Sequence, residues 1–355
     1  MQYEEKIKAV FKNCANILGL TDEEQLSNLV LSFKDIQPKK TIKILTQKCL
    51  EKFKDSNNAK FKEFLNEIFK LNDGSFASQQ EVVELIKREK QEALRINHEI
   101  VNESLKEVCT KFNELGIDYY IVGALPVYLQ AGQMTRMHED IDFFVAEKDL
   151  PKVAQVLATT QYSFHDYRLN SPRVHDENGK SLCGDHEVVA DRTDSPFHLG
   201  FFLFKREKDG SVTQREYQAR IDKQGIKVPE LFQRKMSKET FEYNYGVEPV
   251  KYLNTEFRAS TAESVYDIKK SLLESHFRPK DAEDVSAWES AKKAGTENPL
   301  IDPVRLEKMR NIAKENPMPP PSRQDLTAEL IEEIKKQQEL MNGCEQPPEQ
   351  NSAEC

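Results

Sequence analysis

The sequence predicts an α+β protein in which a small mixed β-sheet core is flanked by a helical N-terminal region and by C-terminal helices. Apolar residues recur with the period of a helix near the N-terminus, whereas from residue 117 short aromatic and β-branched runs alternate with amphipathic segments. A length of 355 residues favours more than one structural unit. We expect four parts, which are a helical N-terminal region 1–104, a mixed-sheet core 105–254, a C-terminal helical domain 255–315, and a Pro-rich linker, helix and disordered tail 316–355.

The charge and the cysteines limit the function classes. The chain carries 51 basic and 60 acidic residues, so a protein-wide basic surface for nucleic acid is absent, although a local basic cleft is compatible with this balance. Six cysteines include no CxxC pair, which predicts neither a disulfide framework nor a zinc ribbon and is typical of a reducing compartment.

The sequence shows no Sec-type signal and no membrane span. The N-terminal stretch reads MQYEEKIKAVFKN, which is charged and lacks an apolar run, and no stretch of about 18 apolar residues occurs. We therefore expect a cytoplasmic protein, while export to a host by machinery that reads other signals stays open.

Helical patterns dominate the N-terminal region. One stripe is formed by Ile7, Val10, Cys14 and related positions, and Thr21 with Glu24 resembles a capping box that opens a second helix. A long helix is expected from about residue 79 to residue 115, with Ser78 as N-cap and Gly116 at its end. These stripes indicate core packing or, alternatively, a helical module that binds a protein partner.

Mixed elements follow. Strands are expected over 117–123, 141–145, 161–168, 186–190 and 197–204, with short helices over 124–132 and 149–160. Asp209-Gly210 predicts a hairpin after the last of these strands, and Asp191 and Asp194 look like turn residues. Further helices are expected over 261–275 and 278–293, and another follows the proline-rich stretch near residue 320.

Two aspartates mark the strongest candidate site. In TRMHEDIDFFV, Asp140 and Asp142 stand two residues apart at the start of an apolar strand, so their carboxylates point to the same face. Two like charges on a buried strand are costly without a counter-ion, and Mg²⁺ prefers such oxygen ligands together with substrate phosphates. The alternative is an ordinary polar-to-apolar transition. The Gly123-Ala124 turn upstream, between a strand and a helix, is suited to phosphate but equally to a tight turn.

With these residues in view, GALPVYLQAGQMTRMHEDIDFFV resembles the signature of the nucleotidyltransferase superfamily with the polymerase-beta-type fold. The form TRMHEDID is most similar to the aminoglycoside and lincosamide nucleotidyltransferase branch. A second stretch, SVYDIKKSLLESHFRPKDAEDV, resembles the helix pair that follows the catalytic domain there. The resemblance covers residues 105–290 and makes 105–254 the expected catalytic core.

The resemblance implies roles for individual residues. Asp140 and Asp142 would be catalytic and hold Mg²⁺, and Gly123 and Ala124 would contact the phosphates of the nucleotide. Three further residues would bind the nucleotide as well, which are Arg136, His138 and Lys269. Lys270 is the alternative to Lys269 on the same helix, and Lys280 with Asp281 would be a structural pair or lie at the edge of the site.

The third carboxylate of this family is missing from its expected strand, PFHLGFFLF. His198 can replace the acid as catalytic base or ligand, since imidazole suits proton transfer near neutral pH, and Glu187 on the preceding strand is the alternative. Zinc is not expected, because no pair among the histidines and cysteine over 165–198 has a zinc-site spacing.

These features predict an Mg²⁺-dependent nucleotidyltransferase that moves a nucleoside monophosphate, AMP by preference, from ATP or another NTP to a hydroxyl. The acceptor is an unidentified small molecule, protein or RNA, and the net acidic chain disfavours a large RNA. The alternative is a catalytically degenerate domain that binds a nucleotide or a partner through its helical flanks.

Overall fold

The computed structural model describes residues 2–19, 37–170, 174–175, 181–183, 187–246, 248–252, 254–275, 278–298 and 300–343. The chain divides into two compact units, Met1–Ile96 and Asn97–Cys355. The predicted part boundaries at residues 104, 254 and 315 stay a prediction. No helix among these residues is both long and apolar enough to cross a bilayer.

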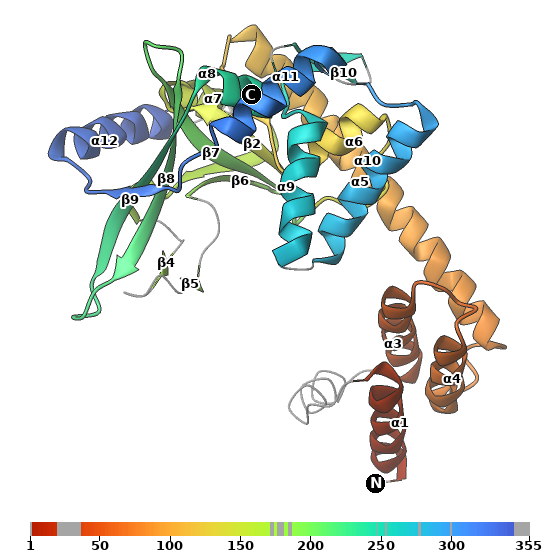
Figure 1. The fold of residues 1–355 in the computed structure, drawn as a ribbon. Helices are drawn as coiled ribbons and strands as arrows, with labels where there is room; N and C mark the ends of the chain where they lie inside the picture. The colour runs from red at the N-terminus through yellow and green to blue at the C-terminus, as the bar shows by residue number, and fades with distance from the viewer. Residues whose placement is uncertain are drawn as a thin grey trace, which may run out of the picture. The chain divides into compact units, whose positions relative to one another are not determined.

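The first unit is helical (Figure 1). Its described elements are α1 (Gln2–Leu18), α3 (Pro38–Phe53), α4 (Ala59–Ile68), the 3-10 turn Phe69–Leu71 and the first part of α5 (Gln79–Glu114). Local signals set these bounds, since Pro lies in the first turn of α3, Asn58 caps α4, and the Ser78 hydroxyl accepts the Glu81 N–H at 3.2 Å. The predicted capping box at Thr21 and Glu24 lies outside the described residues.

The apolar stripes of this unit form one core, as expected from their spacing. Val10, Phe11 and Cys14 of α1 are buried together with Phe61 and Phe64 of α4. The long predicted helix is confirmed as α5, which ends before Gly116 at φ +61°.

The second unit is built on a mixed sheet, ten-stranded over the described residues. β1 (Tyr119–Ile121) pairs antiparallel with β2 (Asp140–Ala146), which runs parallel to β7 (His198–Arg206). The C-terminal half of β7 continues into β8 (Val212–Ile221) through the predicted Asp209-Gly210 hairpin, and β8 pairs with β9 (Lys227–Met236). These two strands form the long hairpin of Figure 1.

The N-terminal half of β7 has a different neighbour. There β6 (Val188–Arg192) pairs antiparallel with β7 and in turn with β3 (Tyr162–Asp166). Three short strands complete the sheet, which are β4 (Val174–His175), β5 (Ser181–Cys183) and β12 (Ser322–Gln324). β2 is an interior strand of this sheet, because β1 pairs with it on one side and β7 on the other.

The helices of this unit are α6 (Leu125–Ala131), α7 (Leu150–Leu157), α8 (Lys238–Tyr245), α9 (Ala262–Ser275), α10 (Pro279–Ala294), α11 (Pro303–Glu315) and α12 (Ala328–Asn342). Short elements are the 3-10 turns Glu147–Asp149 and Arg168–Asn170 and the hairpin β10 (Val250–Tyr252) with β11 (Thr255–Phe257). α6 packs against α9 and α10 around Trp288, which is fully buried.

The α+β class and the mixed sheet are confirmed, but the sheet extends further than predicted. β9 was not predicted, because Pro229 lies within it and proline lacks the N–H of a ladder donor. β12 was expected to be part of a linker, and its three exposed residues carry no strand pattern. The predicted disordered tail lies outside the described residues.

A buried ionic cluster connects the centre of the sheet with the C-terminal helix. Glu147, which directly follows β2, accepts hydrogen bonds from Arg168 at 3.1 Å, from Tyr217 at 2.6 Å and from Arg215. Arg168 is fully buried and also donates to Gln337 of α12 at 2.9 Å. Removing one partner of such a cluster leaves buried charge uncompensated.

We therefore expect Glu147→Gln to lower the free energy of unfolding of the second unit by about 3 kcal/mol. Urea denaturation followed by fluorescence measures this unit alone, because Trp288 is the one tryptophan of the chain. The exposed Glu332 of α12 provides the control Glu332→Gln, which should change little. Equal stability of the two variants would contradict the prediction that the ionic cluster around Glu147 stabilises the second unit.

Candidate active site

Asp140 and Asp142 lie at the start of the interior strand β2. Asp140 is its first residue, and both side chains point to the same face because strand residues two apart do so. The Asp140 side chain is 42% exposed, whereas Oδ1 of Asp142 has no access to solvent. One carboxylate therefore lies at the surface and the other is enclosed behind it.

The Gly123 turn lies directly against Asp142. Gly123 has φ +72°, and a Cβ at this position would come within 2.8 Å of Oδ2 of Asp142. Next to it, the Val122 N–H donates to the Asp142 carbonyl oxygen at 2.8 Å. The turn needs glycine for its backbone angle and for the space that the carboxylate occupies.

Burial and the neighbouring Asp140 carboxylate raise the pKa of Asp142 from its ordinary value of 3.8 to about 7, although Lys280 and Lys269 lower it. A second negative charge at this place is therefore unfavourable near neutral pH. A divalent cation bound by both carboxylates would remove this penalty, and the oxygen donor set suits Mg²⁺.

A cleft of about 560 Å³ opens in front of the two aspartates. Its lining includes Gly123, Ala124, Asp140 and Asp142. Its other walls are contributed by the segment before β2 and by α9 and α10, through Arg136, Met137, Glu139, Lys269, Arg278, Lys280 and Glu283. The structure thus brings together two stretches of sequence that are more than a hundred residues apart.

The basic wall is fixed by two fully buried carboxylates of α10. Asp284 accepts from Arg136 at 2.7 Å and from the Tyr128 hydroxyl at 2.6 Å, and its other oxygen lies 2.7 Å from Nζ of Lys269. Asp281 lies 2.7 Å from the same Nζ and 2.6 Å from Nε of Arg278. We call these six side chains the α10 cluster.

The α10 cluster keeps its aspartates ionised. Burial alone would raise the pKa of Asp284, but hydrogen bonds from Arg136, Lys269 and Tyr128 outweigh it and hold the pKa below the ordinary value. In Asp281 burial is likewise outweighed, by hydrogen bonds from Arg278 and Lys269, so its pKa is also lowered. Three cations and two anions leave the cluster with one net positive charge toward the cleft.

His198 lies beside Asp140, as the parallel register of β2 and β7 requires. The two residues are register partners, and Nε2 of His198 is 3.9 Å from Oδ2 of Asp140. Glu187, the alternative from the sequence, is fully buried just before β6, and neither Glu187 nor His198 is among the residues that line the cleft. The geometry therefore favours His198 over Glu187 as the side chain next to the aspartates.

Asp191 is not the turn residue that the sequence suggested. It belongs to β6 and is the register partner of His198, so Asp140, His198 and Asp191 form one row across three strands. Its Oδ2 also lies 3.8 Å from Nε2 of His165. The motif VVADR could have revealed it, because Asp191 continues an apolar run at strand spacing.

His138 lies behind the cleft. Its ring is buried against Tyr128 with ring centroids 5.1 Å apart, and its backbone is fixed by Asn97 of α5. Burial, together with the charge of Arg136, lowers the pKa of His138 to about 3, so the ring is neutral at physiological pH. Its predicted contact with the nucleotide has no geometric support.

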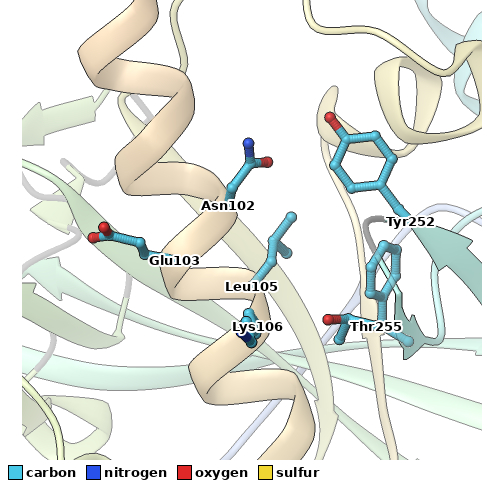
Figure 2. A pocket seen from close by; sticks show the side chains of 7 residues that line it. Asn102, Glu103, Leu105, Lys106, Tyr252 and Thr255 are labelled. Carbon is cyan, nitrogen blue, oxygen red and sulfur yellow. The ribbon is translucent and has the colours of Figure 1, made fainter.

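A second cavity, of about 260 Å³, lies between α5 and the β10–β11 hairpin (Figure 2). Its lining combines Leu105 and Phe257 with Tyr252, Thr255, Asn102, Glu103 and Lys106. It has one carboxylate and no glycine turn. Among the described residues, no group of three or more histidine, cysteine, aspartate or glutamate side chains could hold a metal ion.

The family model described as aminoglycoside-2''-adenylyltransferase matches residues 104–182. This range contains the Gly123 turn and both aspartates, but neither His198 nor the α10 cluster. The match confirms the predicted resemblance to the nucleotidyltransferases and, with it, the prediction that the chain is an enzyme of this class. No protein of curated function shows significant similarity to the chain.

Solved structures that resemble the chain include the lincosamide antibiotic adenylyltransferase LnuA with lincomycin bound, at 16% identity and a TM-score of 0.35, covering 53% of this chain and 96% of that one. Another is ANT(2'')-Ia in complex with adenylyl-2''-tobramycin, at 11% identity and a TM-score of 0.34, covering 59% and 94%. TM-scores this low carry no functional conclusion.

Gly123→Ala should displace Asp142, because the new Cβ overlaps its carboxylate. Gly132→Ala is the matched control, since Gly132 has φ +79° but no atom within 4 Å of its added Cβ. We expect both variants to lose about 1 kcal/mol of stability from backbone strain. Mn²⁺ binding, measured by electron paramagnetic resonance, should weaken in Gly123→Ala alone. Equal binding in both variants would contradict a role of the Gly123 turn in positioning Asp142.

The raised pKa of Asp142 predicts a pH dependence of stability in the presence of EDTA. Between pH 4 and pH 7 the folded state holds a proton that the unfolded state has lost, so the free energy of unfolding falls as the pH rises through this window. The slope relative to Asp142→Asn is at most about 1.4 kcal/mol per pH unit. Denaturant titrations of both proteins measure it, and parallel pH profiles would contradict the assignment.

Proposed function

We propose that this protein transfers a nucleoside monophosphate, AMP from ATP, to a hydroxyl group of a small molecule and releases pyrophosphate in an Mg²⁺-dependent reaction. The observation that carries the proposal is the carboxylate pair of Asp140 and Asp142, the second of them against the Gly123 turn, in a cleft that is also lined by the basic side chains Arg136, Lys269, Arg278 and Lys280. This arrangement suits the anionic triphosphate of a nucleotide.

The charges of the cleft support the requirement for a divalent cation. Its lining carries four basic side chains, Arg136, Lys269, Arg278 and Lys280, and four acidic ones, Glu139, Asp140, Asp142 and Glu283. A triphosphate brings several further negative charges to a lining that has no net positive charge. Mg²⁺ held by Asp140 and Asp142 would offset these charges and stabilise the oxygens of an in-line displacement.

The chain's own residues orient the nucleotide. Gly123 and Ala124 line the cleft, and the backbone there offers close approach to phosphate oxygens, since glycine has no side chain to prevent it. Arg136 faces the cleft while Asp284 fixes its guanidinium, so its position is set before the nucleotide binds. Such preorganisation supplies most of the catalysis in phosphoryl and nucleotidyl transfer.

His198 is placed to act as general base. In the proposed step the acceptor hydroxyl gives its proton to the His198 ring, its oxygen bonds to the α-phosphorus, and the bond to the bridging oxygen breaks as pyrophosphate leaves. His198 adjoins Asp140 on one side and Asp191 on the other, and its side chain is 31% exposed. The imidazole can therefore accept a proton at the surface of the site.

A small-molecule acceptor is proposed because the matching family is described as an aminoglycoside adenylyltransferase. A protein or RNA acceptor stays a prediction, as does a protein partner for the N-terminal unit, because the family match does not reach residues 1–103. The base preference for adenine rests on the same description.

The alternative function is nucleotide binding without transfer. One observation favours it, namely that β7 places His198 and Gly200 beside Asp140 and Asp142, where the family carries an acid. If the histidine cannot replace that acid, the cleft would bind a nucleotide and leave it intact.

The decisive assay incubates the protein with α-labelled ATP, Mg²⁺ and hydroxylated small molecules, including aminoglycosides and lincosamides, and follows labelled product and pyrophosphate. We expect transfer by the wild type and a loss of at least about a hundredfold in Asp140→Asn and Asp142→Asn. The exposed Asp325 provides the control Asp325→Asn, which should retain full activity.

His198 separates the two functions. His198→Ala should lower the rate by about a hundredfold while leaving ATP binding intact, the size expected for loss of a general base. Wild-type protein that binds ATP but releases no pyrophosphate with any acceptor class would support the binding function and overturn transfer.

A further inference from the structure

The basic side chains of the cleft differ in how firmly they are already paired. Arg136 is bound by Asp284, Arg278 by Asp281, and Lys269 by both aspartates. The Lys269 side chain is only 12% exposed, and its Nζ lies 2.7 Å from each of the two carboxylates. Its ammonium group is therefore committed to the α10 cluster.

Moving Lys269 to a phosphate would leave buried charge behind it. Asp281 and Asp284 are fully buried, and Lys269 is the residue that joins them. An enclosed carboxylate that loses a cation pays a desolvation cost that an exposed phosphate contact does not offset. Lys269 thus holds α9 against α10 rather than reaching into the cleft.

Lys280 has the opposite properties. It lies in the first turn of α10, lines the cleft and is exposed. Among the described basic residues that line the cleft, it is the one without an ion-pair partner. Its ammonium can turn toward an incoming anion without breaking an ion pair, and its neighbour in sequence, Asp281, belongs to the α10 cluster.

We infer that Lys280 is the lysine that binds the triphosphate of the nucleotide, and that Lys269, which the sequence resemblance favoured, is a positioning residue of the α10 cluster. This inference rests on the proposed function and adds a phosphate-binding residue that lies outside the range of the family match. The two lysines therefore differ in a way that binding and stability measurements can separate.

The test measures binding of Mg²⁺ with a non-hydrolysable ATP analogue by isothermal titration calorimetry. We expect Lys280→Gln to raise Kd about tenfold or more, the effect of losing one charge-assisted hydrogen bond, without a change in the melting temperature. Lys280→Arg should recover most of the affinity. Lys270→Gln is the matched control, because Lys270 contacts Tyr266 and does not line the cleft, and its Kd should equal that of the wild type.

Lys269→Gln provides the opposite pattern. It should lower the melting temperature of the second unit, followed by Trp288 fluorescence, because two buried carboxylates lose their shared cation. Unchanged affinity in Lys280→Gln, with wild-type protein that does bind the analogue, would overturn the inference and leave the proposed function standing. Wild-type protein that binds no nucleotide would instead remove the proposed function and the inference together.

Discussion

Mutual repulsion of two carboxylates on one face of an interior strand is the constraint on which the site depends. Ionising both Asp140 and Asp142 is unfavourable, because burial of Asp142, together with the charge of Asp140, raises the pKa of Asp142. The surrounding structure increases the conflict, since the Gly123 turn leaves just enough space for the second carboxylate and encloses it. A site that maintains such repulsion is suited to a cation that relieves it.

The α10 cluster resolves a similar problem in another way. Asp281 and Asp284 are more deeply buried than the β2 pair, yet their pKa values are lowered, because cations and a tyrosine hydroxyl surround them. One pair of aspartates therefore serves as structure and the other is available for chemistry. Asp281 and Asp284 bind Arg136, Lys269 and Arg278, and so determine which basic side chains remain free for a substrate. In this way α10 shapes a cleft that is formed largely by other elements.

Much of this could be predicted from the sequence, because the signals are local. The Asp-x-Asp spacing placed both side chains on one face, and glycines marked the ends of α5 and α6. The remainder depends on pairing between distant segments. The turn pattern around Asp191 does not show that β6 pairs with β7, the helical spacing of Lys269 does not show that Asp281 and Asp284 surround it, and Pro229 masks the strand pattern of β9. No local pattern records which residues become neighbours.

The central claim is that the β2 aspartates hold a cation for a nucleotide, and a crystal structure with Mn²⁺ and a non-hydrolysable ATP analogue tests it most directly. Anomalous scattering locates the manganese without ambiguity. The account predicts a manganese peak in contact with carboxylate oxygens of both Asp140 and Asp142 and with phosphate oxygens of the analogue. A nucleotide bound elsewhere, for example in the cavity beside Tyr252, or a phosphate group in the cleft with no manganese at the aspartates, would contradict it.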